Sequence, residues 1–182
     1  MEKVLEEACE SLRNGGVILY PTDTIWGLGC SAENEEGISK LSAIKERKEG
    51  KNYLVLVSDE RMLNNYVQEF PEVAYDLLDN VEEPLTIVYP KCTPKMKHLA
   101  AEDGSIAIRM VKDKFCIALI RKLKAGLVST SANFSGQAYE HDVPQALKDR
   151  LDYCCDIPLK EGNKPSKMIK LSMNGEFKII RG

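Results

Sequence analysis

The 182-residue sequence is poor in histidine, and this scarcity limits the chemistry that it can support. His98 and His141 are the only histidines, so a histidine-rich metal site is excluded and a histidine-activated nucleophile has little support. The six cysteines include no C-x-x-C pair, and the adjacent Cys154 and Cys155 are poorly spaced for chelation. We therefore expect the cysteines to be small buried hydrophobic residues in a reducing cytoplasm.

Long apolar runs are also missing. No run approaches the roughly 18 residues of a membrane span, and the N-terminal "MEKVLEEACESLRNGG" is acidic and amphipathic, without the apolar core of a signal peptide. The sequence therefore predicts a cytoplasmic protein without a membrane partner. The net charge of -3 argues against a surface that binds nucleic acid throughout, although it permits a local basic patch.

Several common motifs of nucleotide binding and covalent catalysis are absent. The sequence has no G-x-x-x-x-G-K-[ST] phosphate loop, no G-x-G-x-x-G fingerprint and no G-x-S-x-G elbow. An enzyme with this sequence would bind and orient its reactants instead of attacking them covalently.

Apolar patterning indicates an α/β fold made of one domain over residues 1–182. The runs 17–20, 53–57 and 127–130 are typical of buried strands, amphipathic helical segments alternate with them, and residues 144–151 are expected to be helical. Asn174 and Gly175 predict the turn of a terminal hairpin. Because prolines and this hairpin interrupt the alternation, we expect a twisted, mixed sheet flanked by helices.

Polar side chains follow several of the predicted strands, where α/β folds place ligands. In "YPTDTIWGLG", Thr22, Asp23 and Thr24 offer hydroxyls and a carboxylate, while Gly27 and Gly29 permit close backbone approach. A turn held by a threonine or aspartate side chain explains the same residues equally well. Both interpretations therefore stay open.

A second cluster, "IKERKEGK", is rich in cations and lies where a predicted helix ends. Cations at this end of a helix favour its dipole, and this solvated arrangement is the better interpretation for Lys48. Lys45 and Arg47 could instead converge on one polyanion. Phosphate would suit them, with the arginine acting as a fork and the lysine as a point charge.

Arg109 stands inside the apolar run of a third cluster, "SIAIRM", on the same side of the predicted strand as Ser105. An arginine in this position is costly unless it faces a cleft or pairs with a carboxylate. A structural salt bridge is the alternative to a functional role, and we favour the functional role.

The fourth cluster, "STSANFSG", directly follows a buried strand. An ordinary polar loop that caps the next helix is one interpretation. The density of hydrogen-bonding side chains favours a ligand site. These side chains are Ser129, Thr130, Ser131, Asn133 and Ser135.

The order of these clusters resembles the YrdC family. The motifs run as PTDT-x-x-GLG, K-x-R, PLT, S-x-x-x-R, STSAN-x-SG, and finally a late serine followed by IIRG. The match extends from Gly16 to Gly182. Each motif alone is modest, but their shared order is highly specific.

The resemblance implies a nucleotidyltransferase, threonylcarbamoyl-AMP synthase, on an open, twisted sheet with a concave, positively charged face. The family condenses L-threonine, bicarbonate and ATP, with Mg²⁺ accompanying ATP and no tightly bound cofactor or dedicated metal site. It releases pyrophosphate, and partner machinery uses the product for threonylcarbamoyladenosine modification of tRNA. The alternative is a YciO-like relative that binds tRNA or double-stranded RNA without synthesis. The lysine of K-x-R and the "SAN" triplet favour the enzyme.

Residue by residue, the resemblance implies two groups of contacts. The threonine contacts are Thr24, Arg109, Ser129 and Ser166. The ATP contacts are Lys45, Arg47, Lys51, Ser105, Ser131, Asn133 and Arg181, of which Lys45 and Arg47 are also the catalytic pair.

The sequence departs from the family pattern at several positions. Lys48 and Asn52 replace common prolines, which makes that loop less stiff. Leu56 stands where a histidine is common, which removes one expected substrate contact, and Lys167 replaces a threonine. Trp26 stands where tyrosine is frequent, and we expect it to form a hydrophobic wall. We also expect no extra C-terminal domain, and loop 158–166 is a candidate mobile segment.

Overall fold

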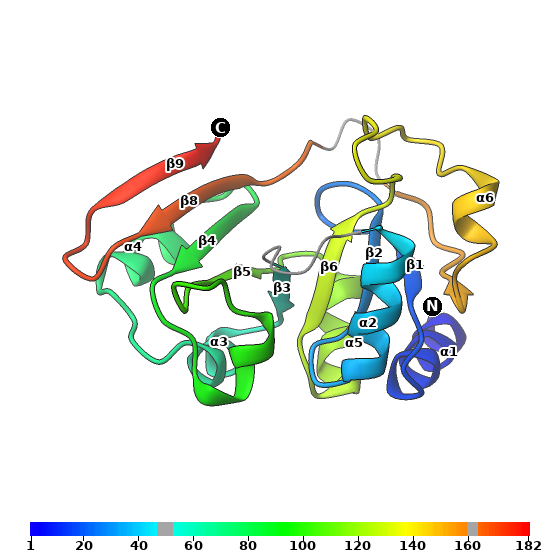
Figure 1. Ribbon diagram of the computed structural model, residues 1–182, viewed down its shortest axis with the longest axis horizontal. Coiled ribbons are helices and arrows are strands. Elements are labelled where there is room, and N and C mark those ends of the chain that lie inside the picture. Colours follow the sequence, from blue (N-terminus) through cyan, green and yellow to red (C-terminus); the bar gives the residue numbers. More distant parts are fainter. Residues whose placement is uncertain (47–52, 160–163) are drawn as a thin grey trace.

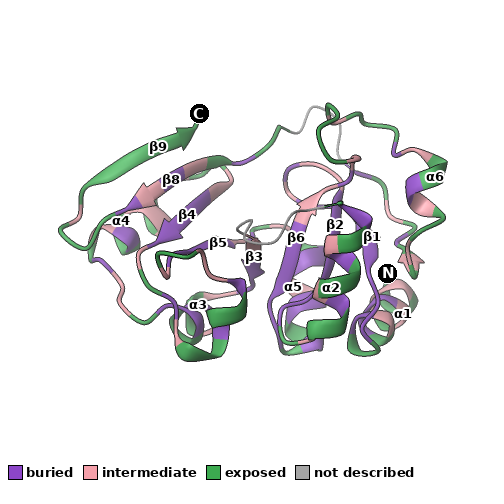
Figure 2. Cartoon of the chain, in the orientation of Figure 1, coloured by how far each residue is buried: buried purple, intermediate pink, exposed green. Residues whose placement is uncertain are grey.

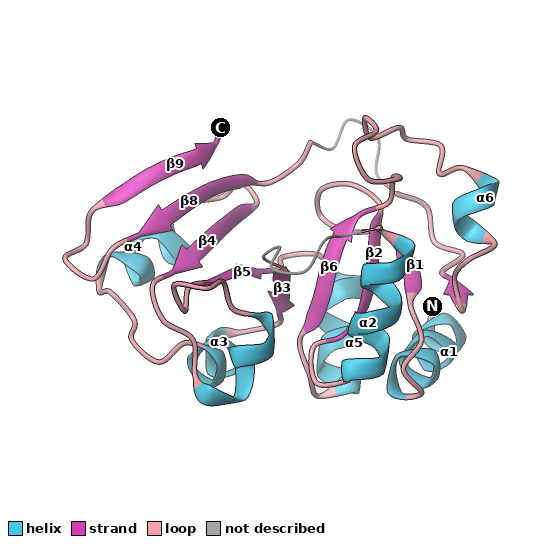
Figure 3. Ribbon diagram, in the orientation of Figure 1, coloured by secondary structure: helices cyan, strands magenta, loops and turns pink. Residues whose placement is uncertain are grey.

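The computed structural model describes residues 1–46, 53–159 and 164–182, which form a mixed α/β fold (Figures 1 and 3). Its strands are β1 (Ile18–Tyr20), β2 (Gly27–Ser31), β3 (Leu54–Val57), β4 (Leu85–Tyr89), β5 (Ile106–Met110), β6 (Leu127–Ser131), β7 (Tyr153–Cys154), β8 (Lys167–Leu171) and β9 (Phe177–Arg181). Its helices are α1 (Glu2–Arg13), α2 (Glu35–Ile44), α3 (Glu60–Tyr66), α4 (Val73–Asn80), α5 (Lys114–Leu123), α6 (Gln145–Lys148) and the 3₁₀ helix η1 (Pro94–Leu99).

The strands form one sheet in the order β7-β1-β2-β6-β3-β5-β4-β8-β9. Three neighbouring pairs are parallel, namely β7 with β1, β3 with β5 and β4 with β8, and the other pairs are antiparallel. The sheet does not close on itself, since β7 and β9 lie at its two ends. The prediction of an open, mixed sheet is therefore confirmed. The positive charge of its concave face stays a prediction.

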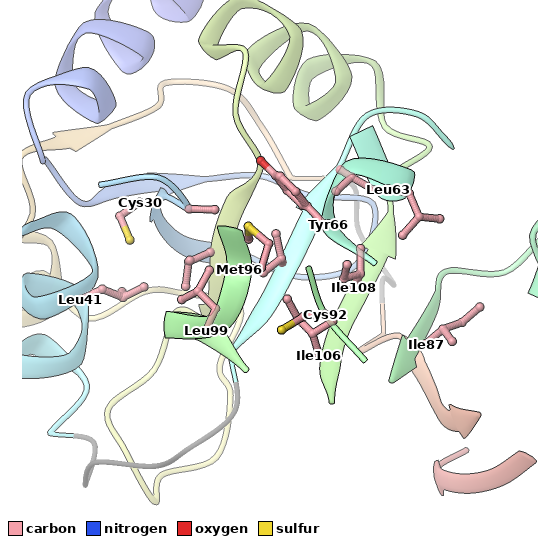
Figure 4. Packing of buried hydrophobic residues seen from close by; sticks show 14 of the residues in the cluster. Cys30, Leu41, Leu63, Tyr66, Ile87, Cys92, Met96, Leu99, Ile106 and Ile108 are labelled. Carbon is pink, nitrogen blue, oxygen red and sulfur yellow. The ribbon is translucent and has the colours of Figure 1, made fainter. Parts of the chain in front are cut away.

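Helices cover both faces of the sheet. On one face, α1 and α5 bury an apolar stripe against Leu56 and Leu127. On the other face, α2, α3 and η1 pack around β2, β3, β5 and β6, with Tyr66 and Met96 near the centre of the cluster and Leu41 at its edge on α2 (Figure 4). The outer helix surfaces and β9 are exposed, whereas the central strands are buried (Figure 2). Two apolar layers thus hold the central strands rigidly in register.

Side-chain caps fix where α2 and α5 begin. The Asn34 side chain accepts a hydrogen bond from Gly37 N at 3.0 Å at the start of α2, as expected for an N-cap residue. Asp113 does the same for α5 through Cys116 N at 2.9 Å. Each cap satisfies a backbone donor that the first helical turn leaves without a partner.

Two elements differ from the sequence-based expectation. The helix expected over 144–151 is only α6, because Asp152 N donates to Val17 O at 2.9 Å and the chain then pairs with β1 as β7. Gly27–Ser31, for which no strand was predicted, is a fully buried strand. The predicted terminal hairpin is confirmed as β8 and β9. Gly175 has a φ of +83°, a conformation that glycine adopts without strain.

All six cysteines have free thiols, and five are buried as expected. Cys154 is the exception, because it and the buried Cys155 point to opposite sides of the chain. Among the helices of the described residues, none is long and apolar enough to cross a membrane.

Candidate active site

A cavity of about 880 Å³ lies on the face of the sheet that α1 and α5 cover only in part. In the strand register, Leu54 is paired with both Ala107 and Ser129, and all three residues line the cavity. Leu56 and Leu127, two residues further along, are buried beneath the helices. The cavity therefore begins where the helical cover ends.

The cavity brings together predicted residues from distant parts of the chain. Those that line it are Thr24, Ser105, Arg109, Ser129, Ser131, Ser166 and Arg181. They come from the segment before β2, from β5 and β6, and from the C-terminal hairpin. This convergence needs the whole sheet, since no two of these segments are neighbours in sequence.

The Thr22–Thr24 segment is both a turn and a part of the wall. Thr22 Oγ1 accepts a hydrogen bond from Thr24 N at 3.0 Å and donates to Ile25 O at 2.8 Å, which is the side-chain-held turn. The same hydroxyl lies 2.8 Å from Thr24 Oγ1, and both threonines line the cavity. The turn is therefore present, and it lies in the cavity wall, while the binding role stays a prediction.

Arg109 is buried at the wall and has two partners. Its Nη2 lies 3.1 Å from Asp23 Oδ1, in an ion pair whose side chains are 4% and 11% exposed. Its Nη1 donates to Thr24 Oγ1 at 3.2 Å. The salt bridge and the cavity position, which the sequence offered as alternatives, are thus both present. Asp23 itself does not line the cavity and stands behind the guanidinium.

Ser129 is held by Tyr20, a residue that the sequence did not single out. The Tyr20 hydroxyl donates to Ser129 Oγ at 2.6 Å, and Tyr20 is completely buried. Gly27 and Gly29 make room for its ring, because a Cβ on Gly29 would lie 2.8 Å from Tyr20 Cε1. The close approach for which these glycines are needed is therefore that of Tyr20. Burial raises the pKa of Tyr20 well above its ordinary value.

Ser166 and Arg181 line the cavity next to each other. Arg181 Nε donates to Ser166 O at 2.8 Å and its Nη2 to Ser166 Oγ at 3.1 Å, while Ser166 Oγ lies 2.8 Å from Thr86 Oγ1. A register shift between Met168 and Ile169 lets both Ile180 and Arg181 line the cavity. Partial burial lowers the pKa of Arg181, and the nearby charge of Arg109 adds to the effect.

Ser105 is tied to a carboxylate at the rim. Asp103 Oδ1 accepts hydrogen bonds from Ser105 N at 3.0 Å and Ser105 Oγ at 2.5 Å, and Asp103 Oδ2 accepts one from Lys170 Nζ at 2.7 Å. Lys170 and Ser105 hold the pKa of the Asp103 carboxyl well below its usual range. No sequence pattern pointed to Asp103 or Lys170, because their contact requires two segments far apart in the chain to meet.

Lys45 and Asn133 lie behind the cavity wall. Lys45 is buried, and its Nζ donates to Ser131 O at 2.9 Å, to Asn133 Oδ1 at 3.0 Å and to Asn133 O. Ser131 Oγ donates to the same Asn133 Oδ1 at 2.6 Å. The lysine charge is thus fixed beside the predicted "SAN" segment.

Some predicted features lie outside the described residues. These are Arg47 and Lys51 of the ATP group, the departures Lys48 and Asn52, and residues 160–163 of loop 158–166.

The other family departures have clear positions. Leu56 is buried beneath α5, away from the cavity, whereas Trp26 lines the cavity as expected. Lys167 is half exposed and pairs with Glu83 at 2.5 Å.

The described residues contain no group of three or more His, Cys, Asp or Glu side chains that could hold a metal ion. Glu102 and Asp103 are the carboxylates that line the cavity, and Asp103 is already bound to Lys170 and Ser105. Magnesium commonly binds through one or two carboxylates together with substrate phosphates. The lining therefore fits a magnesium ion that is held mainly by the phosphates of a bound substrate.

Comparisons with known proteins agree with this architecture. A model of the family described as "Telomere recombination", Sua5/YciO/YrdC, matches residues 10–182. A relative from Pseudoalteromonas translucida named threonylcarbamoyl-AMP synthase is 31% identical over 187 residues, which cover 100% of this chain and 98% of that protein. The structure of Escherichia coli YciO is similar with a TM-score of 0.82 and 26% identity, over 100% of this chain and 89% of YciO.

A further structure, Pyrococcus abyssi Sua5 complexed with L-threonine, shares the fold with a TM-score of 0.79 and 22% identity. The similarity covers 93% of this chain and 51% of the Sua5 chain, so this chain spans about half of the length of Sua5. The family match, the near-complete coverage of the synthase relative and the shared fold lead to one conclusion. The chain belongs to the Sua5/YciO/YrdC family.

Proposed function

We propose that the protein is a threonylcarbamoyl-AMP synthase, which condenses L-threonine, bicarbonate and ATP and releases pyrophosphate. The observation that carries the proposal is one cavity lined by Thr24, Arg109, Ser129 and Ser166, together with a second arginine, Arg181. The relative of that name, similar over the full chain, supports the same reaction.

The amino-acid end of the cavity is proposed to lie around Arg109. The guanidinium is held by Asp23 and Thr24, so it is already oriented before a substrate carboxylate arrives. Thr24, Ser129 and Ser166 add buried hydroxyls on the surrounding walls. The L-threonine in the Sua5 complex supports an amino-acid ligand for this fold.

The nucleotide end is proposed to involve Ser105, Ser131, Asn133 and Arg181, with Lys45, Arg47 and Lys51 at the phosphates. Arg181 and Lys170 are cations on this side of the lining, which favours an anionic ligand. Lys45 brings its charge to the back of the Ser131 segment. Lys45 and Arg47 are the proposed catalytic pair, which would spread charge over the phosphates.

The proposed chemistry requires positioning more than covalent catalysis. The threonine amine takes up bicarbonate as a carbamate, with loss of water. A carbamate oxygen then attacks the α-phosphorus of ATP, and pyrophosphate leaves. The protein must hold two anions close together and stabilise the developing charge, which arginines and fixed hydroxyls do well. Magnesium bound to ATP would neutralise phosphate charge, with Glu102 as the carboxylate on the wall that could share in holding it.

The direct test is a set of omission assays. Pyrophosphate release is measured with protein, ATP, Mg²⁺, L-threonine and bicarbonate, and then with each substrate left out in turn. The proposal predicts release only in the complete mixture. Release that does not depend on threonine would overturn it.

A second candidate is an RNA-binding relative without synthase activity, favoured by the full-length likeness to YciO. The fold does not distinguish the two functions. The match to the synthase relative covers 98% of that protein, which favours the enzyme. Tight binding of tRNA or double-stranded RNA together with no binding of ATP would make the RNA-binding function the better candidate.

In the cell, we propose that the product passes to tRNA-modifying partners in the cytoplasm.

A further inference from the structure

Tyr20 is the largest buried polar residue next to the cavity that the proposed reaction does not use. It lies at the end of β1, completely buried between the glycines of β2 and the apolar face of α5. Its ring lies close to Gly27 and Gly29: a Cβ on Gly29 would collide with it at 2.8 Å, and one on Gly27 would be in tight contact at 3.1 Å. The strand is therefore built around this ring, although the core would need only an apolar side chain there.

The tyrosine hydroxyl contacts a residue of the cavity wall. It donates a hydrogen bond to Ser129 Oγ at 2.6 Å. The bond spans β2, which pairs with β1 on one side and with β6 on the other. A serine hydroxyl has one hydrogen to donate and two lone pairs to accept with. Because Tyr20 occupies a lone pair, the Ser129 hydrogen stays available to another acceptor. Among the described residues, none accepts a hydrogen bond from Ser129 Oγ.

Ser129 is 5% exposed, and the surface that it does expose lines the cavity. Its hydrogen is therefore left available on the side of the cavity. The raised pKa of Tyr20, caused mainly by burial, keeps the phenol protonated and hence a donor at neutral pH.

We propose that Tyr20 is a positioning residue, which holds Ser129 so that its hydroxyl donates to an oxygen of the amino-acid substrate. This inference rests on the proposed function, in which Ser129 contacts threonine. Tyr20 touches no reactant itself, and its effect is transmitted through the single hydrogen bond to Ser129.

The test compares Tyr20→Phe with Tyr89→Phe. The Tyr20→Phe ring still fills the space above Gly27 and Gly29, so only the hydrogen bond is lost. Tyr89 is equally buried, but it packs against Phe70 on the opposite face of the sheet. Pyrophosphate release is measured against threonine at saturating ATP, and against ATP at saturating threonine.

Tyr20→Phe is expected to raise the KM for threonine by about 2- to 12-fold, the range for one lost hydrogen bond. The KM for ATP should stay at the wild-type value, and Tyr89→Phe should change neither. Ser129→Ala should raise the threonine KM at least as much. The double variant should be no worse than Ser129→Ala alone, because both changes remove one interaction.

A purely structural role for Tyr20 would lower the melting temperature and the active fraction without changing the threonine KM. A wild-type threonine KM in Tyr20→Phe, or additive effects in the double variant, would overturn the inference. Calorimetric titration of threonine, without ATP, separates this result from the proposed function. If the wild type binds threonine but releases no pyrophosphate, the proposed reaction fails, and the ratio of the two dissociation constants still decides the role of Tyr20. No threonine binding to the wild type would overturn both.

Discussion

Asp23 and Arg109 form a buried ion pair, 3.1 Å from Oδ1 to Nη2, in which Arg109 lines the cavity and Asp23 stands behind it. The carboxylate compensates a cation that β5 would otherwise bury alone, and it fixes the direction in which the guanidinium points. The pair therefore serves stability and the site at the same time.

Asp23→Asn should destabilise the protein strongly. Removing one partner leaves the Arg109 charge buried without compensation, a change that typically costs about 3–5 kcal/mol. Urea unfolding measures the loss. Glu69→Gln is the control, because it breaks an exposed pair with Lys91 and should change little. Equal stability of the two variants would contradict the structural role given to Asp23.

Arg109→Lys should weaken threonine binding selectively. Lysine keeps the charge but lacks the fork that reaches Asp23 and a substrate carboxylate together. The threonine KM should rise about 10- to 150-fold, the equivalent of one charged hydrogen bond. Arg121→Lys, at an exposed position on α5, should behave as the wild type. An unchanged threonine KM in Arg109→Lys would mean that the carboxylate of threonine does not bind to Arg109.

Gly29→Ala should lower stability because the new methyl group has no space. Its Cβ would lie 2.8 Å from both Tyr20 Cε1 and the Val128 carbonyl oxygen, and overpacking of this kind costs about 1–3 kcal/mol. Thermal unfolding measures the effect, with Gly182→Ala as a control in open space. A melting temperature equal to that of the control would show that β2 does not need glycine there.

These glycines explain why part of the fold could not be predicted from sequence. Apolar runs identified β1, β3 and β6, since each packs between helical layers. In Gly27–Ser31 only Leu28 and Cys30 are apolar, and the two glycines are more typical of a turn than of a strand. These glycines are explained by the ring of Tyr20, which lies against them only once β1 and β2 pair. The polar ends of strands pointed correctly to the cavity. Asp103 and Lys170 could not be found in this way, since their contact depends on the register of the whole sheet.

The Asp103–Lys170 contact predicts a pH dependence of stability. Lys170 and Ser105 stabilise the Asp103 anion and hold its pKa well below the usual value. A carboxyl whose folded-state pKa is lowered contributes stability that is complete above its unfolded pKa of about 4 and is lost as the pH falls further. The melting temperature should therefore fall less steeply below about pH 4 in Asp103→Asn than in the wild type.

Thermal unfolding in a buffer series checks this slope. Asp79→Asn is the matched control, since Asp79 is an exposed carboxylate on α4. It should keep the wild-type slope. Identical slopes in wild type and Asp103→Asn would mean that the contact with Lys170 adds no stability.

The central claim is that this cavity joins threonine, bicarbonate and ATP into one product. Mass spectrometry of a reaction with ¹³C-bicarbonate, L-threonine, ATP and Mg²⁺ tests it most directly. The account predicts threonylcarbamoyl-AMP that carries one ¹³C atom, formed by the wild type and strongly reduced in Arg109→Lys at low threonine. ATP turnover without a labelled adduct, or no turnover at all, would contradict it.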